Sequence, residues 1–199
     1  MDKYANFIEL ERNEREGEDY AILLREANSK IAIIAPHGGG IEPGTIGIAD
    51  AVASSDYTFY AFKGIKKRGN KILHITSNRF DEPIGIKTSE NAYIAISIHG
   101  CRDKIEIVFI GGKNRKLKEK IMYGLRTAGF RAVISEEPWL RGKSSENICN
   151  RCRSGKGVQL EISRGLREKM FYCLDRRSLR KKTELFYKFV STLKGFLPL

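Results

Sequence analysis

The chain holds only three histidines, His37, His74 and His99, and each follows an apolar run that predicts a strand. Glu42 comes five residues after His37, in a turn that contains three consecutive glycines. Glycines let the backbone fold back, so both side chains can converge on one point. Two histidines and one glutamate, here His37, Glu42 and His99, are a ligand set of catalytic zinc that leaves a fourth position for water. Such an ion polarises a carbonyl group, so the pattern indicates an amide hydrolase.

Glu161 is the candidate for the carboxylate that such a site needs as its general base. It lies in the segment GVQLEISRGLR, at the end of an otherwise apolar predicted strand. Ligands of open α/β sheets gather beyond the carboxyl ends of strands, and a charge there is unusual unless the protein uses it. The structural alternative is a partly buried glutamate that pairs with Arg164.

Arginines near these segments could hold substrate carboxylates through bidentate contacts. The candidates are Arg79, Arg151, Arg164 and Arg167. For each of them, a surface or structural ion pair is an equally good interpretation. Either Asp50 or Asp81 could orient a metal-binding histidine by accepting a hydrogen bond from the ring nitrogen that does not bind the metal.

With 199 residues, the chain is long enough for one domain with a substantial core, and we expect a single domain over residues 1–199. Hydrophobic residues make up 41% and charged residues 30%, a balance typical of globular proteins. No apolar run approaches the roughly 20 residues that span a bilayer. The polar, acidic N-terminal segment does not resemble a signal peptide, so we expect synthesis in the cytoplasm.

The net charge of +12 indicates an anionic partner. A nucleic acid, an anionic membrane surface and an acidic polymer all fit this charge, and a solubilising surface is the alternative. The sequence shows neither a basic recognition helix nor an aromatic RNA-binding strand, which argues against a nucleic acid.

Cys149 and Cys152 form a CxxC pair, and no second pair accompanies them. A zinc site of four cysteines is therefore unsupported, and a redox dithiol remains an open interpretation. Because no secretion signal is recognised, disulfide bonds are not expected.

Short segments rich in Ile, Val, Phe and Tyr predict the strands of a sheet. They are Tyr20–Arg25, Ile31–Ala35, Thr58–Lys63, Lys71–Thr76, Tyr93–His99, Ile105–Phe109, Arg131–Ile134 and Gly157–Ile162. Helical spacing of apolar residues predicts helices over about Thr45–Ala53, Arg115–Ala128 and Ser178–Lys194. We expect Pro36 to end a strand and Gly195 to end the last helix. The alternation of strands and helices predicts a three-layer α/β domain with a largely parallel or mixed sheet.

A series of segments, taken in order, resembles the poly-γ-glutamate hydrolase family of bacilli and their phages, often labelled phage-related replication proteins. These segments are GEDYAILL, IAIIAPHGGGIEPGT, FYAFKG, LHITS, FDEP, SIHGC, ENICNR and GVQLEISRGLR. The resemblance spans nearly the whole chain, and APHGGGIEPGT is a long and specific motif. Ile46–Gly47, Asn78–Arg79 and Cys152–Arg153 depart from the family pattern. These departures bear on substrate preference, since none touches the proposed metal ligands.

The resemblance implies a zinc carboxypeptidase-like fold, which is an open mixed sheet with helices on both faces. It also implies a zinc-dependent hydrolase of γ-glutamyl amide bonds, in which a metal-bound water attacks the carbonyl. Carried over by position, His37, Glu42 and His99 match the metal ligands. Glu161 matches the general base, and His74 in LHITS corresponds to a further, catalytic residue of the site. The implied substrate is a polyanion, which a protein of charge +12 attracts, and we expect the enzyme to act as a monomer.

Two other functions remain open. An amidohydrolase of the same zinc class would act on small N-acyl acidic amino acids or cell-wall peptides, and would cleave short substrates as readily as polymer. A basic nucleic-acid-binding protein would bind DNA in a salt-sensitive way that survives chelation. If the protein is encoded by a phage, release on cell lysis would bring it to an extracellular polymer.

Overall fold

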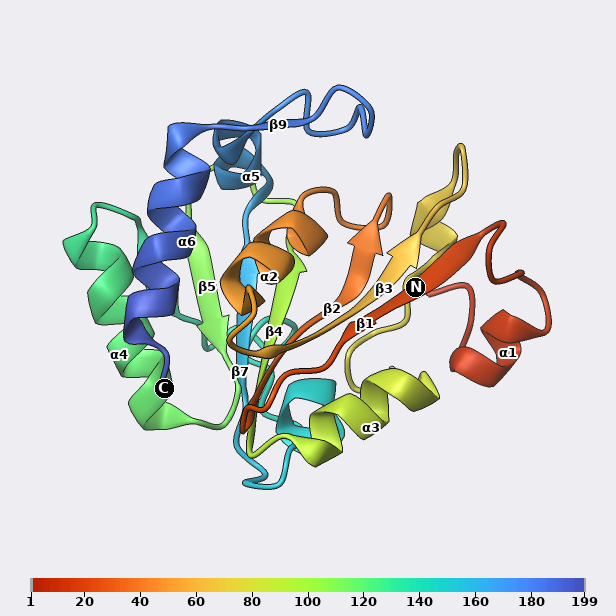
Figure 1. Ribbon diagram of the computed structural model, residues 1–199, viewed down its shortest axis with the longest axis horizontal. Helices are drawn as coiled ribbons and strands as arrows, with labels where there is room; N and C mark the ends of the chain where they lie inside the picture. Colours follow the sequence, from red (N-terminus) through yellow and green to blue (C-terminus); the bar gives the residue numbers. More distant parts are fainter. Residues whose placement is uncertain (1, 199) are drawn as a thin grey trace.

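The computed structural model describes residues 2–198, and a seven-stranded sheet of order β1-β3-β2-β4-β7-β5-β6 forms its centre (Figure 1). The strands are β1 (Tyr20–Arg25), β2 (Ile31–Gly39), β3 (Thr58–Gly64), β4 (Ile94–Gly100), β5 (Val108–Gly111), β6 (Ala132–Ile134) and β7 (Val158–Ile162). The pairs β2–β3, β2–β4, β4–β7 and β5–β6 are parallel, whereas β1–β3 and β5–β7 are antiparallel. The sheet is therefore mixed and mostly parallel, as the sequence predicts.

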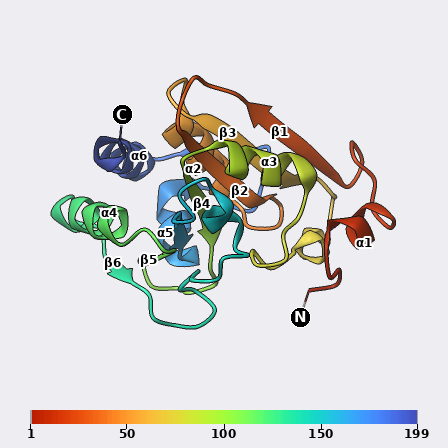
Figure 2. The ribbon, with the colours of Figure 1, turned by 90° about the horizontal axis from the view of Figure 1, so that it is seen from below.

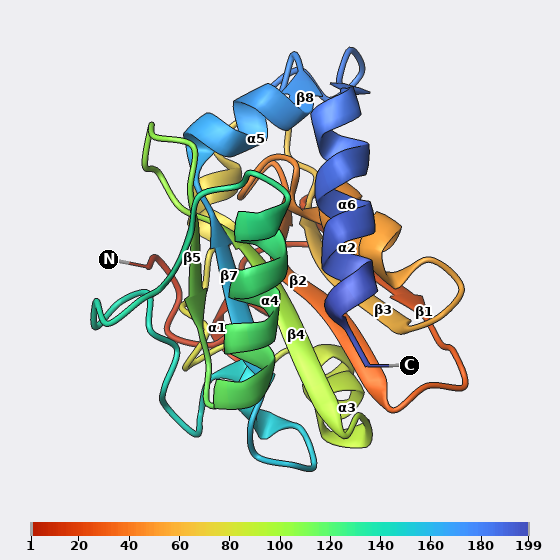
Figure 3. The ribbon, with the colours of Figure 1, turned by 90° about the vertical axis from the view of Figure 1, so that its left-hand side faces the viewer.

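Helices cover both faces of this sheet (Figures 2 and 3). The larger core lies under α2 (Thr45–Ala53), α4 (Arg115–Thr127), α5 (Arg164–Met170) and α6 (Glu184–Phe196). The opposite face is covered by α1 (Phe7–Glu11), α3 (Pro83–Asn91) and two 3₁₀ turns, η1 (Asn70–Leu73) and η2 (Ile148–Arg151). A short hairpin of β8 (Phe171–Tyr172) and β9 (Lys181–Lys182) connects α5 to α6. The predicted three-layer α/β fold with an open sheet is thus confirmed.

Several boundaries differ from the sequence prediction; the strand expected over Ile105–Phe109, for example, is found at Val108–Gly111. Pro36 does not end β2, which runs on to Gly39 with a shift in its register to β3 between Ala35 and Gly38. An irregularity of this kind is where a strand accommodates a residue that lacks an N–H donor. The last helix begins at Glu184 rather than near residue 178, and Gly195 lies inside it.

The predicted strand Lys71–Thr76 is wrong, because this segment contains the 3₁₀ turn η1 followed by a loop. Its apolar residues Leu73 and Ile75 are buried in the core beneath α1 and α3 instead of joining the sheet. Burial of every second or third residue in a loop imitates the alternation of a strand.

β7 lies between β4 and β5, although β4 and β5 follow one another in the sequence. Because β2, β4 and β7 run parallel, their carboxyl ends reach the same edge of the sheet (Figure 1). His99 of β4 and Glu161 of β7 are direct neighbours in the register. This edge is where ligands of open α/β sheets bind. Among the helices of residues 2–198, none is both long enough and apolar enough to cross a membrane.

Candidate functional site

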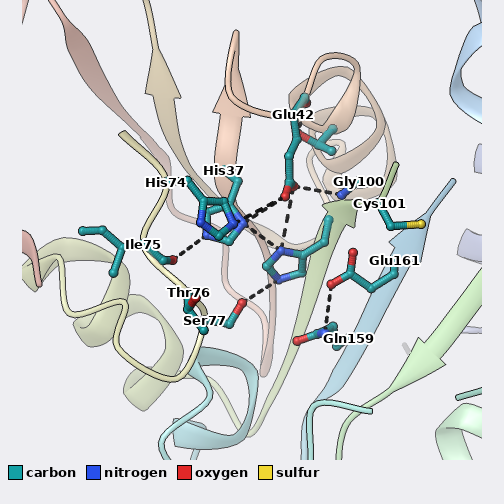
Figure 4. A network of polar contacts seen from close by, with 12 residues as sticks. His37, Glu42, His74, Ile75, Thr76, Ser77, Gly100, Cys101, Gln159 and Glu161 are labelled. Carbon is teal, nitrogen blue, oxygen red and sulfur yellow. Dashed lines mark hydrogen bonds and ion pairs between the residues drawn. The ribbon is translucent and has the colours of Figure 1, made fainter. Parts of the chain in front are cut away.

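The loop that follows β2 brings His37 and Glu42 together (Figure 4). The Glu42 N–H donates to the His37 carbonyl at 2.9 Å, and Gly39 has a φ of 70°, which favours glycine. Glu42 Oε1 lies 3.2 Å from His37 Nδ1. Glu42 Oε2 accepts a hydrogen bond of 2.8 Å from the Gly100 N–H. The end of β4 therefore orients the carboxylate that the loop supplies.

His99 completes a buried cluster with these two residues. Its Nδ1 lies 3.1 Å from His37 Nδ1 and 3.9 Å from Glu42 Oε2. One ligand atom from each of the three side chains falls within 4.8 Å of the other two. The three residues that sequence analysis selected thus converge on a single point.

This donor set fits a metal ion. His37 Nε2 lies 2.7 Å from the Ile75 carbonyl oxygen, which can only accept, so Nε2 carries a proton. That contact aims His37 Nδ1 at the cluster, in the way that metal-binding histidines are usually oriented. Two nitrogens in a tetrahedral zinc site lie about 3.3 Å apart. The two Nδ1 atoms are separated by 3.1 Å, so His37, Glu42 and His99 could hold such an ion.

Burial and neighbouring charges set the protonation of the cluster. Burial, reinforced by the positive charge of His37, lowers the pKa of His99 to about 3. Burial opposes the ionisation of Glu42, but His37 outweighs it and lowers the Glu42 pKa to about 2. Neutral His99 and ionised Glu42 are thus in the forms that bind metals. Burial opposes the protonation of His37, but the charge of Glu42 outweighs it and raises the His37 pKa, so His37 would release its proton when a metal binds.

Glu161 lies beside the cluster, on the strand next to that of His99. Its Oε1 accepts a hydrogen bond of 3.0 Å from Gln159 Nε2, and only 9% of the residue is exposed. Burial, together with the negative charge of Glu42, raises the pKa of Glu161 well above its usual value. The alternative of a structural pair with Arg164 is wrong, because Arg164 bonds to Glu168 and Asp175 instead.

His74 packs against the cluster from the loop after η1. Its ring centroid lies 4.0 Å from that of His37, and its Nε2 lies 3.9 Å from Glu42 Oε1. The prediction that all three histidines gather at one edge is confirmed, although His74 does not follow a strand. Its other ring nitrogen, Nδ1, lies 2.7 Å from Asp2 Oδ1.

The other acidic candidates do not orient a histidine of the site. Asp50 bonds to Arg25, and Asp81 accepts a hydrogen bond from the Phe7 N–H. Besides Glu42, the acidic residue that contacts a histidine of the site is Asp2, which lies 72 positions away in sequence from His74. No local pattern marks such a pair.

The predicted arginines take different positions. Arg167 is buried and donates to the carbonyls of Ile162, Pro43 and Cys101, so it ties the loop that holds Glu42 to the ends of β4 and β7. Arg79 bonds to Asp2, and Arg151 bonds to Glu146. Arg164 and Arg167 line a cavity at the site, whereas Arg79 and Arg151 line neither cavity there.

Two cavities meet at the cluster, with volumes of about 680 and 580 Å³. Glu42, His74 and Glu161 line both of them. Basic side chains line each cavity: Lys3, Lys71, Arg102, Arg164 and Arg167 line the first, and Arg141 and Lys143 line the second. The cleft therefore offers positive charge on both sides of the cluster.

Sequence reasoning missed Asp2, Gln159 and the loop that carries Arg141 and Lys143. Gln159 had a usable signal, because it precedes Glu161 by two residues in one strand and so shares its face of the sheet. Arg141 and Lys143 had no such signal, because the local sequence does not show which loop lies next to the edge of the sheet.

Comparisons with known proteins identify relatives of this chain. A family model described as poly-gamma-glutamate hydrolase matches residues 4–192. YndL of Bacillus subtilis strain 168 is 38% identical over 200 residues, which cover 98% of this chain and 78% of YndL. A solved structure described as zinc-free YndL has 36% identity and a TM-score of 0.89 over 98% of this chain and 97% of that one.

A solved bacteriophage poly-gamma-glutamate hydrolase is also similar, with a TM-score of 0.94 and 33% identity over 98% of this chain and 96% of that chain. An N-formylglutamate amidohydrolase from Ralstonia eutropha shares the fold alone, with 12% identity and a TM-score of 0.56 over 89% of this chain and 95% of that chain. The matches at higher identity cover 98% of this chain, and the range of the family model includes His37, Glu42 and His99. The chain belongs to the poly-γ-glutamate hydrolase family.

Proposed function

We propose that the chain is a single zinc-dependent hydrolase domain that cleaves the γ-glutamyl amide bonds of poly-γ-glutamate. The observation that carries this proposal is the convergence of His37, Glu42 and His99 beside Glu161, between two cavities with basic linings. The descriptions of the phage hydrolase and of zinc-free YndL support both the substrate and the metal. Zinc held by these donors would act as a Lewis acid that polarises the amide carbonyl.

The general base in this proposal is Glu161. Because Gln159 holds Oε1, the second carboxylate oxygen is free to take a proton from the attacking water. Glu161 then delivers that proton to the departing amide nitrogen. Burial, together with the negative charge of Glu42, raises the pKa of this carboxyl well above its usual value, which favours a group that must hold a proton and then release it.

The remaining site residues bind and orient the substrate. His74 lines both cavities, so we place it against the amide that is cleaved. Arg164 and Arg167 supply positive charge in the first cavity. Arg79 supports His74 indirectly, because it donates a hydrogen bond to Asp2, and Asp2 contacts His74.

The test measures polymer length after incubation with the purified protein, by size-exclusion chromatography, with chelator and then with zinc restored. We expect shortening that stops with chelator and returns with zinc. Glu161→Gln should retain zinc and lose activity by at least about 100-fold, since a general base contributes roughly that much or more. His37→Ala should lose both zinc and activity.

Intact polymer in a sample that contains stoichiometric zinc would contradict the proposal. Equal rates on short γ-glutamyl substrates and on polymer would instead favour an amidohydrolase of small molecules. DNA binding that persists in chelator, without any cleavage, would favour the nucleic-acid alternative.

A further inference from the structure

Asp2 holds three hydrogen-bond donors at the rim of the site. Its Oδ1 lies 2.7 Å from His74 Nδ1. Its Oδ2 accepts from the Thr76 N–H at 2.7 Å and from the Arg79 guanidinium at 2.8 Å. The side chain is only 10% exposed, so water does not compete freely for these contacts.

The segment that carries Asp2 is itself anchored. Tyr4 is buried, and its hydroxyl donates to Glu14 at 2.5 Å. Glu14 is in turn paired with Lys66, which lies two residues after the end of β3. The Asp2 carboxylate is thus fixed from both sides, by the donors of the η1 loop and by the buried tyrosine that follows it.

These contacts determine which ring nitrogen of His74 faces the cleft as a hydrogen-bond acceptor. A carboxylate only accepts hydrogen bonds, so the nitrogen of His74 that faces Asp2 must carry a proton. In the neutral ring, the lone pair then lies on Nε2, which is 3.9 Å from Glu42 Oε1. His74 lines both cavities, so this acceptor is offered to whatever occupies the cleft.

We propose that Asp2 is a positioning residue, which holds the His74 ring in one orientation and one tautomer so that Nε2 accepts a hydrogen bond from the substrate amide. The inference rests on the proposed function, because it assigns a role at the same site. Hydrogen bonds from Thr76 and Arg79 hold the Asp2 carboxylate in place for this contact. Burial opposes the ionisation of Asp2, but the hydrogen bonds from Thr76 and His74 outweigh it and lower the pKa of its carboxyl to about 2, so this acceptor stays ionised into acidic pH.

The test compares zinc-loaded wild type with Asp2→Ala and Asp2→Asn. Carboxylates that hold metal-binding histidines are typically worth 10- to 100-fold in activity, and we expect an effect of similar size for the carboxylate that holds His74. We expect Asp2→Ala to lower kcat on poly-γ-glutamate by about 10-fold or more with little change in KM or in zinc content. Asp2→Asn retains an acceptor oxygen and should recover part of this loss.

Nitrogen-15 NMR of the histidine rings reports the tautomer independently of activity. With only three histidines, the spectrum contains three ring patterns to assign. In wild type, His74 should show a protonated Nδ1 and an unprotonated Nε2. Asp2→Ala should lose this pattern at His74 while the patterns of His37 and His99 persist.

Asp81→Ala is the matched control, because Asp81 also anchors the N-terminal segment, through the Phe7 N–H, but contacts no histidine of the site. It should lower Tm while kcat and the His74 pattern are retained. An Asp2→Ala protein with the wild-type His74 pattern and wild-type kcat would overturn the proposal. A wild type that leaves the polymer intact would contradict the proposed function alone, since the ring pattern still tests Asp2.

Discussion

Gly100 is the residue at which the fold and the site depend on one another. Its N–H holds Glu42 Oε2, so the backbone of β4 orients a candidate metal ligand. A Cβ at this position would lie 2.5 Å from Cζ of Arg167. Arg167 cannot withdraw without cost, because its guanidinium is buried and bonded to three carbonyl groups. Glycine is therefore required here by contact rather than by backbone conformation.

Gly100→Ala should lower both stability and activity. Overpacking of this kind costs about 1–3 kcal/mol. In a chain of this size each kcal/mol lowers Tm by about 2–4 °C, so we expect a fall of roughly 2–12 °C, which thermal unfolding would detect. Gly195→Ala is the control, because a Cβ there meets nothing within 4 Å in α6 and should raise helix stability. Wild-type Tm and activity in Gly100→Ala would show that Arg167 is not confined.

At the scale of elements, the loop between β6 and η2 forms one wall of the cleft. Trp139, Arg141 and Lys143 of this loop line the second cavity. Trp139 is 73% exposed, an unusual position for a large aromatic side chain unless it contacts something. The chain contains no other tryptophan, so this side chain reports on its own loop.

Occupation of the cleft should change the fluorescence of Trp139. Poly-γ-glutamate added to Glu161→Gln, which binds without cleaving, should shift or quench the emission because the indole leaves water. Dextran of similar length, which carries no charge, should leave it unchanged. If emission stays constant at polymer concentrations that saturate the enzyme, the polymer does not cross this loop.

The sequence predicts elements where the signal is local. Helix α2 follows from the helical spacing of its apolar residues and strand β1 from its composition. The candidate ligands His37 and His99 follow from their positions after apolar runs in the sequence. Asp2 could not be found in this way, because its contact with His74 spans 72 residues. The apolar residues of η1 imitate a strand because they fill a core outside the sheet.

At the scale of the whole molecule, the excess of positive charge matters for capture of the substrate. The chain carries 36 Lys and Arg residues against 24 Asp and Glu residues, and some of this excess lines the cleft on both sides of the cluster. A long polyanion is attracted by the summed charge, whereas a short substrate is attracted mainly by the few groups that it touches. The expected monomeric state and cytoplasmic synthesis stay predictions.

Salt should therefore slow cleavage of long polymer more than cleavage of short γ-glutamyl oligomers. Between about 0.01 and 1 M salt, the screening length falls from about 30 to about 3 Å, which removes attraction beyond direct contact. Initial rates at low substrate concentration would measure this effect. Equal salt dependence for long and short substrates would show that capture depends on local contacts alone.

During synthesis, the sheet remains in two pieces until residue 162 has been made, because β7 is the strand that joins β4 to β5. Until then, the inner edges of both pieces present unpaired backbone groups that other nascent chains could bind. The strand that closes this gap also carries Glu161. The chain therefore acquires its proposed base in the same folding step that pairs the inner edges of β4 and β5, while β1 and β6 remain the outer edges. A product truncated before β7 should be both inactive and prone to aggregation.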